Sequence, residues 1–207
     1  MAVKPSRSFL VAELTVLFVI VPVLYWLDWI PVHKVIPLAI LFAYCLIVLV
    51  RHKRMSADMF GMAAHWKSII VRFLLMGALI FLCIRFFFER SLVADFSANQ
   101  KLISMIIMYP LMSALPQEVI FRAFFFYRYE EIFRNNLVML IANIMLFAFA
   151  HVYFGNWVVI AFTLIGGLFF SLTYLKTRSL LVVTIEHTMY GLLILSSGLS
   201  GYFYKAF

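Results

Sequence analysis

Apolar stretches long enough to cross a lipid bilayer recur along the whole of this chain, and they limit its possible folds more than any other feature. A membrane-spanning helix needs about 20 mostly apolar residues. The strands of a membrane β-barrel would instead show short segments of alternating polarity, whereas the apolar stretches here are continuous. The apolar share of 66% is also too high for an ordinary soluble domain. The sequence therefore predicts an all-α, polytopic helical membrane protein.

Seven membrane-spanning helices are expected, and residues 1–207 are interpreted as one membrane domain. The expected ranges are 9–26, 35–50, 68–88, 102–128, 137–154, 158–175 and 180–196. Pro116 lies inside the fourth range, where a kink or a new helix start is expected because proline removes a helix hydrogen bond. A full break there would raise the count to eight.

Basic residues lie mainly in the connections on one side of the expected spans. The connection 51–67 is the most basic of the chain, whereas 89–101, on the opposite side, has no basic excess. Since lysine and arginine accumulate in cytoplasmic loops, we expect a cytoplasmic N-terminus and a C-terminus outside. The net charge of +8 therefore indicates contact with the lipid bilayer, and no nucleic-acid partner is expected.

The stretch 117–122, with the sequence QEVIFR, places two charged residues inside the fourth expected span. Glu118 and Arg122 are four residues apart, so they share one face of a helix and can pair. A charged residue at the centre of a membrane helix costs about 2.5–3.5 kcal/mol on insertion scales, and such residues usually have a function. This pair is therefore the first candidate for a functional site.

Two histidines interrupt later spans at a similar expected depth. His151 lies in the fifth expected span and His187 in the seventh, and a rise of about 1.5 Å per residue places both near the level of Glu118. One carboxylate and two imidazoles could activate a water molecule, either directly by general base catalysis or through a metal ion. If a metal such as zinc is bound, Glu118, His151 and His187 are its expected ligands.

Each candidate also has a structural interpretation. Glu118 and Arg122 could form an ion pair that only locks helices together, and His151 could lie at the outer membrane interface. Asn143 gives the fifth expected helix a partly polar face, which could serve only for hydrogen bonds between helices.

In order and spacing, three of these segments resemble the signatures of the CPBP intramembrane proteases. The segments are QExxxR at 117–122, FxxxH at 147–151 and His187 in a late span. This family includes the CAAX prenyl protease 2 (Rce1-like) enzymes and the lysostaphin-resistance-protein-A-like and bacteriocin-immunity proteins. The resemblance covers residues of about 102–195, and it implies a protease core in this part of the membrane domain.

The resemblance implies a role for each matched residue. In the mechanism usually proposed for the family, the first of two motif glutamates and a histidine activate water, while an asparagine and another histidine stabilise the oxyanion. The first glutamate corresponds to Gln117 and the second to Glu118, while Arg122 corresponds to a largely structural arginine. His151 and His187 correspond to the two catalytic histidines.

Two positions depart from the family pattern. Gln117 cannot act as a general base, although its amide could orient water or donate to an oxyanion. Gly191 stands where the family has asparagine or a similar polar residue, and it has no side chain to donate. Three explanations are open: Glu118 replaces the missing base, Glu186 supplies a second carboxylate, or the chain binds peptides without cleaving them.

The function expected from this resemblance is an intramembrane endopeptidase that hydrolyses a membrane-associated or lipidated peptide. Family members have been described both as metalloproteases and as glutamic proteases, so the cofactor is either absent or a divalent metal such as zinc. A catalytically inactive peptide-binding or immunity protein is the alternative, and a small proton-coupled transporter is a third hypothesis. The multi-pass protein is expected in a bacterial cell membrane, with a membrane-anchored peptide or protein as partner.

Overall fold

The computed structural model describes residues 5–62, 66–88, 106–133, 135–197 and 199–203, and the regular secondary structure in these ranges is helical. The long elements follow the expected spans closely. They are α1 (Arg7–Thr15), η1 (Val16–Ile20) and α2 (Val21–Trp26), which form one continuous helix, then α3 (Val35–Arg51), α4 (Trp66–Cys83) with η3 (Ile84–Phe88), α8 (Asn136–Phe149), α9 (Trp157–Thr177) and α10 (Leu180–Leu195).

The lengths and compositions of these helices confirm a polytopic helical membrane protein. Four segments are long and apolar enough to cross a membrane, namely Arg7–Trp26, Trp66–Phe86, Asn136–Phe154 and Trp157–Thr177. The helices α3 and α10 are shorter but also apolar. The expected outer connection 89–101 lies outside the described residues.

The chain is helical without interruption from residue 106 to residue 128, a segment called the central helix below. It contains η4 (Pro110–Ala114), α6 (Leu115–Glu118), η5 (Val119–Phe124) and α7 (Phe125–Arg128). The helix therefore continues through Pro116 without a new start, and the condition for counting eight helices is not met. Both η4 and η5 are π-helical, and such local widening lets a membrane helix continue past proline residues.

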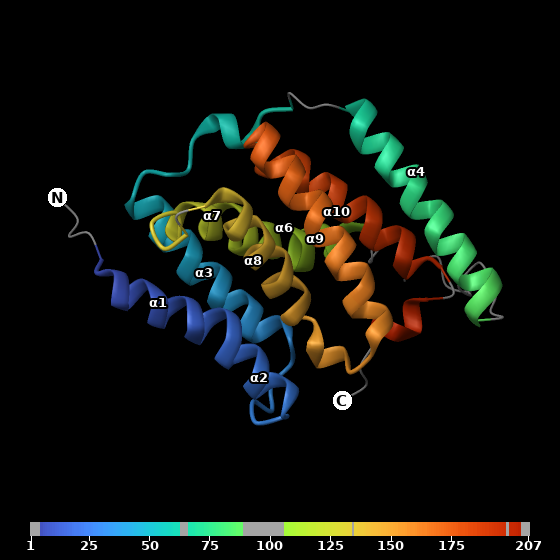
Figure 1. Ribbon diagram of the computed structural model, residues 1–207, viewed down its shortest axis with the longest axis horizontal. Helices are drawn as coiled ribbons and strands as arrows, with labels where there is room; N and C mark the ends of the chain where they lie inside the picture. The colour runs from blue at the N-terminus through green and yellow to red at the C-terminus, as the bar shows by residue number, and fades with distance from the viewer. Residues whose placement is uncertain (1–4, 63–65, 89–105, 134, 198, 204–207) are drawn as a thin grey trace.

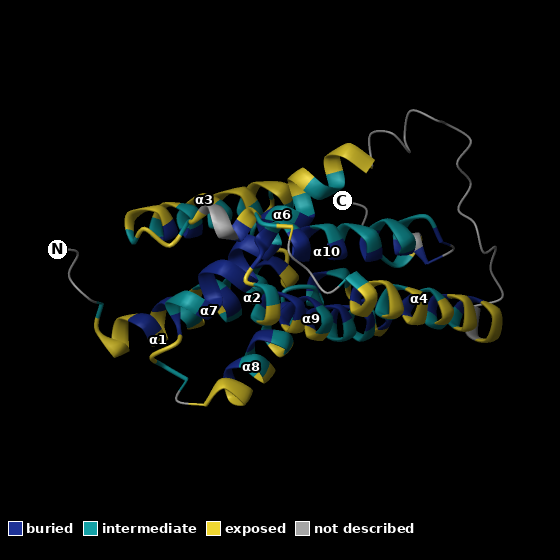
Figure 2. Cartoon of the chain, turned by 90° about the horizontal axis from the view of Figure 1, so that it is seen from above, coloured by how far each residue is buried: buried dark blue, intermediate teal, exposed yellow. Residues whose placement is uncertain are grey.

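The central helix lies inside the bundle, in contact with α3 on one side and α10 on another. Figure 1 shows α9 and α10 side by side, with α4 at the edge of the molecule, where it packs against α10. Figure 2 shows buried residues concentrated between α6 and α7, where every residue of η5 is buried, whereas α3 and α4 carry exposed residues. Polar groups on the central helix are consequently shielded from lipid by its neighbours.

The outer face of α4 is covered by large apolar side chains, as a surface in contact with lipid requires. Ile70, Val71, Leu74 and Leu75 on α4 are all at least half exposed. A soluble protein rarely leaves so continuous an apolar surface uncovered. The polar residues discussed below are therefore set inside an apolar shell.

An ion pair holds α1 against the end of the central helix. Arg128 donates from Nε to Glu13 Oε2 at 2.8 Å and from Nη2 to Glu13 Oε1 at 2.9 Å. Tyr44 on α3 donates a further hydrogen bond to Glu13. Two-pronged arginine–carboxylate contacts fix orientation as well as distance, so they help to position the helix that carries Glu118.

Candidate active site

A direct contact between Glu118 and His187 forms the centre of the site. Glu118 on the central helix is fully buried, and its Oε1 lies 2.7 Å from Nδ1 of His187 on α10. Its other oxygen, Oε2, lies 3.2 Å from Nε of Arg122, as the four-residue spacing predicts. A carboxylate accepts hydrogen bonds, so Nδ1 of His187 carries the proton and Nε2 is left with a free lone pair.

Arg122 connects this centre to two more helices. Its Nη1 donates to Oδ1 of Asn143 on α8 at 2.8 Å, and Asn143 Nδ2 donates to the carbonyl of Phe121 at 2.7 Å. Ser171 on α9 donates to the same Oδ1 at 2.9 Å. These contacts agree with the hypothesis that Asn143 links helices, here the central helix, α8 and α9. Sequence analysis missed Ser171, because a lone serine in a membrane helix carries no pattern of its own.

We expect the substitution Asn143→Ala to lower the free energy of unfolding by about 1 kcal/mol, the usual size of a hydrogen-bond effect between membrane helices. The change removes the acceptor that Arg122 and Ser171 share. Unfolding in lipid bicelles measures the difference. The exposed Asn136, at the start of the same helix, is the matched control, and Asn136→Ala should change stability by less than about 0.5 kcal/mol. Equal stability of both variants would contradict the linking role.

Aromatic rings surround the imidazole of His187. The ring of Phe170 on α9 stacks on it, with the centroids 4.5 Å apart, and those of Phe147 and Tyr109 approach edge-on at 6.0 and 6.1 Å. Such walls exclude water and lipid from the side of the ring, and electrostatic interactions are stronger in the low dielectric that results. They also hold the imidazole in one orientation.

His151 does not lie inside a helix but in the turn that follows α8. This turn still belongs to the membrane-length segment Asn136–Phe154, so His151 lies near the end of the expected fifth span. Its Nδ1 donates to the carbonyl of Phe147 at 2.8 Å, so its Nε2 also has a free lone pair. The Phe147 ring lies 4.9 Å from the His151 ring and, as noted, 6.0 Å from that of His187. Both imidazoles thus lie beside the ring of Phe147, and among the described residues His151 makes no hydrogen bond to Glu118.

Gln117 lies next to Glu118 in the chain but does not join the Glu118–His187 contact. Its Nε2 donates to Ser113 Oγ, one turn earlier in the central helix, at 2.9 Å. Its Oε1 is buried and accepts no hydrogen bond from the described residues. A buried amide oxygen of this kind is an acceptor that a water molecule or a peptide N–H could use.

Glu186 belongs to a separate buried cluster. Its Oε1 lies 3.0 Å from Nη2 of Arg72 on α4 and accepts a hydrogen bond from Tyr190 at 3.1 Å. The same Arg72 nitrogen donates to Thr173 on α9 at 2.6 Å. Although it precedes His187 in the chain, Glu186 faces α4 and α9, so it is not placed to serve as the second carboxylate of the site.

The arrangement does not fit a metal-binding site. Throughout the ranges that the structure describes, no three His, Cys, Asp or Glu residues lie close enough together to hold a metal ion. Both oxygens of Glu118 are engaged, one by His187 and one by Arg122. His151, the third expected ligand, does not group with Glu118 and His187 as a metal site within the described residues.

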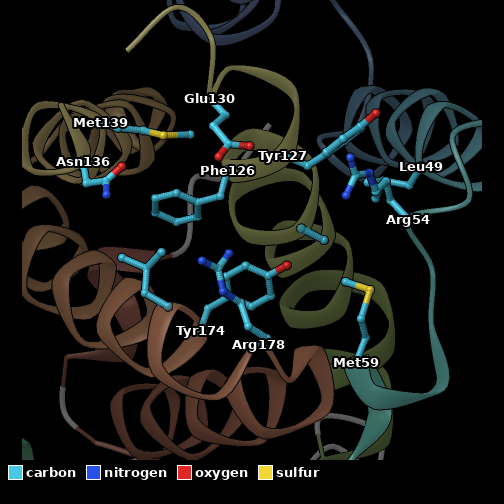
Figure 3. Close-up of a pocket in the computed structure, with 12 residues that line it drawn as sticks. Leu49, Arg54, Met59, Phe126, Tyr127, Glu130, Asn136, Met139, Tyr174 and Arg178 are labelled. Atoms are coloured by element: carbon cyan, nitrogen blue, oxygen red, sulfur yellow. The ribbon is translucent and has the colours of Figure 1, made fainter. Parts of the chain in front are cut away.

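A cavity of about 520 Å³ lies at the end of the bundle where α3 ends and α8 begins. Figure 3 shows Phe126, Tyr174 and Arg178 directed into it. Ala123, on the central helix, also lines it, five residues after Glu118 and hence roughly 8 Å further along the axis. This cavity was not predicted from the sequence, because its lining comes from the ends of five separate segments.

The fold and the buried contacts define a helical membrane protein with a carboxylate–imidazole pair in the interior of its bundle. Residues 99–193 match the family model described as type II CAAX prenyl endopeptidase Rce1-like. Over these residues the chain is similar to the Rce1-like family, whose members are generally proteases. The match covers slightly less than half of the chain, from just before the central helix into α10, and includes Glu118, His151 and His187. No curated protein and no solved structure matches the chain significantly.

Proposed function

We propose that this protein is an intramembrane endopeptidase in which the Glu118–His187 pair activates water. The observation that carries the proposal is the 2.7 Å contact between Glu118 Oε1 and His187 Nδ1. A carboxylate that accepts from one imidazole nitrogen orients the other nitrogen and stabilises the imidazolium that forms when it takes a proton. The Rce1-like family supports peptide hydrolysis as the reaction.

In the proposed reaction, the water oxygen bonds to the carbonyl carbon of the peptide, and the water proton moves to His187 Nε2. The carbonyl electron pair moves onto the oxygen. When the intermediate collapses, the C–N bond breaks and the leaving amine takes the proton from His187. Glu118 keeps its hydrogen bond to Nδ1 throughout, and Arg122 holds Glu118 in place. The free Oε1 of Gln117 orients the water, and His151 Nε2 accepts a hydrogen bond from the bound peptide.

The proposed substrate is a membrane-anchored or lipidated peptide that reaches the site from the cavity of Figure 3. That cavity lies beside Arg54, in the basic connection that is expected in the cytoplasm. The proposed orientation therefore has the N-terminus inside and the C-terminus outside, and a bacterial cell membrane is the proposed location. A lipid anchor would stay in the bilayer, next to the apolar outer faces of the helices.

A peptide-binding protein without activity is the second candidate. Two observations favour it: an amide at Gln117 where the family has a carboxylate, and a bare backbone at Gly191 where it has a polar side chain. Such a protein would hold peptides in the same place but release them intact. Cleavage assays separate the two candidates.

The test compares the wild type with Glu118→Gln in lipid nanodiscs, using a library of lipid-anchored peptides and mass spectrometry of the products. Glutamine keeps the shape of the side chain but cannot stabilise an imidazolium by charge. We expect the wild type to cleave and the variant to be slowed by about 10²-fold, the lower end of general acid–base contributions. Glu131→Gln changes an exposed carboxylate and should leave the rate unchanged.

Glu118→Gln also removes the counter-ion of Arg122, so folding is checked by thermal unfolding of the same samples. If the single variant unfolds, the double variant Glu118→Gln/Arg122→Gln is used in its place. It removes both charges, so no buried arginine is left without a counter-ion, and its cleavage rate is compared with that of the wild type. A folded variant that cleaves as fast as the wild type would contradict the proposed role of Glu118. A wild type that binds peptides but never cleaves them would support the second candidate.

A further inference from the structure

Tyr109, on the central helix, occupies the space above Gly191 on α10. A Cβ atom built on Gly191 would lie 2.0 Å from the Tyr109 hydroxyl oxygen and 2.2 Å from the ring carbon that carries it. Real atoms do not approach so closely, so no other residue fits at position 191 while the phenol stays in place. The phenol tip is therefore in contact with the α10 backbone.

The backbone of Gly191 does not itself require glycine. Among the described glycines only Gly155 has a positive φ, whereas Gly191 is an ordinary residue inside a helix. Glycine is unfavourable there because it lacks a side chain and increases the entropy lost on folding. The close approach of the Tyr109 phenol is the structural reason for this glycine.

This contact lies next to the proposed active site. Gly191 follows His187 by four residues, so both lie on one face of α10. The Tyr109 ring stands edge-on to the imidazole of His187, with the centroids 6.1 Å apart and the planes at 76°. Within the described part of the chain the Tyr109 hydroxyl makes no hydrogen bond, and it lies inside the bundle against α10. Its O–H therefore has no acceptor among the described residues.

We propose that the Tyr109 hydroxyl is a catalytic residue, the hydrogen-bond donor to the carbonyl oxygen of the peptide bond that is cleaved. This inference rests on the proposed endopeptidase function. As water attacks and its proton passes to His187, the carbonyl oxygen gains the electron pair, and the Tyr109 O–H stabilises it without giving up its proton. A buried site strengthens such a donor, because water does not compete for the oxyanion.

The inference accounts for the bare backbone at Gly191. The side chain that the family pattern places there projects from α10 towards the same face as His187. In this chain the central helix fills that space with the tip of Tyr109. The polar donor is thus supplied from another helix, and the substitution to glycine is what makes room for it.

The test is Tyr109→Phe, measured by steady-state cleavage of the peptide that the wild type cuts fastest. Phenylalanine keeps the ring over Gly191 and removes only the hydroxyl, so the fold should be retained. We expect kcat to fall by about 10²–10³-fold, the usual effect of removing an oxyanion donor, with KM nearly unchanged. Tyr129→Phe is the matched control, because Tyr129 is buried between Phe18 and Phe125, away from His187, and its kcat should not change.

A second variant pair tests the position of the donor. Tyr109→Ala empties the space above α10 and should lower kcat by at least as much as Tyr109→Phe. Adding Gly191→Asn to it places an amide N–H donor in the emptied space, and we expect about tenfold or more of the lost kcat to return. Gly191→Asn alone should reduce activity or folding, since its Cβ meets the phenol.

The outcomes separate this inference from the proposed function. If His187→Ala abolishes cleavage while Tyr109→Phe keeps the kcat of the wild type, the protein is a protease and the donor role of Tyr109 is wrong. That outcome is also the one expected if the Tyr109 ring only fills the space over Gly191. If the wild type cleaves no peptide, both the proposed function and this inference are overturned.

Discussion

Replacement of His187 by alanine is expected to lower kcat for cleavage of a membrane-anchored peptide by about 10³-fold or more, near the upper range of general acid–base effects. Nε2 of His187 is the proposed acceptor of the water proton, and alanine offers no substitute. Glu118 remains paired with Arg122 at 3.2 Å, so no buried carboxylate is left without a partner and the fold should survive. Steady-state cleavage in nanodiscs measures the loss, and thermal unfolding confirms the fold.

His33→Ala is the matched control, because His33 is an exposed histidine in the turn before α3 and should not affect kcat. The double variant Glu118→Gln/His187→Ala then separates two possible roles of Glu118. If Glu118 acts only through His187, the double variant should be no slower than His187→Ala, because residues that act as a unit are not additive. Additive losses would instead show that Glu118 takes up the water proton by itself.

Much of the fold could be predicted because the bilayer imposes it. Each apolar stretch must satisfy its own backbone hydrogen bonds in lipid, so span length and position follow from the sequence. The bounds of α3 and α10, Val35–Arg51 and Leu180–Leu195, lie within one residue of the expected ranges. Of the two outcomes expected at Pro116, the new helix start does not occur, because the π-helical turns before and after α6 keep the helix continuous.

The sequence predicted which residues form the candidate site, but not which of them contact each other across helices. The pairing of Glu118 with Arg122 follows from helix spacing alone, because both lie on one helix. Which helix faces His187 and which faces Glu186 depends on packing between helices, and neighbouring residues in α10 point about 100° apart. His187 therefore meets Glu118, whereas Glu186 meets Arg72.

The contact between Tyr109 and Gly191 could have been suspected, but not located, from the sequence. The glycine at position 191, inside an apolar helix, was recognised only as the loss of a polar side chain. The same glycine also leaves space for the Tyr109 side chain. Tyr109 lies 82 positions earlier in the chain and reaches Gly191 only in the folded bundle. A glycine inside a helix, one turn from a candidate catalytic histidine, is thus a reason to search for the side chain that fills its place.

Arg122→Met is expected to lower the free energy of unfolding by about 3–5 kcal/mol, the usual cost of breaking a buried ion pair by removing one partner. Both side chains of the pair are fully buried, so the carboxylate of Glu118 would remain in the bundle without its cation. Asn143 would also lose the hydrogen bond from Nη1. Unfolding in lipid bicelles measures the change, and Arg51→Met, at the exposed end of α3, should cost less than about 0.5 kcal/mol.

The double variant Glu118→Gln/Arg122→Met decides why this arginine is present. Replacing both members of a buried ion pair by neutral residues is often nearly neutral for stability, so the double variant should recover most of the stability that Arg122→Met loses. It should nevertheless cleave about 10²-fold more slowly than the wild type, as expected for Glu118→Gln, because no carboxylate is left to orient Nδ1 of His187. Recovery of stability without recovery of the cleavage rate would mean that the pair is retained for the orientation of His187. A double variant as unstable as Arg122→Met would contradict this, and would assign Arg122 to holding the helices together through Asn143 and the aromatic rings of Phe147 and Phe170.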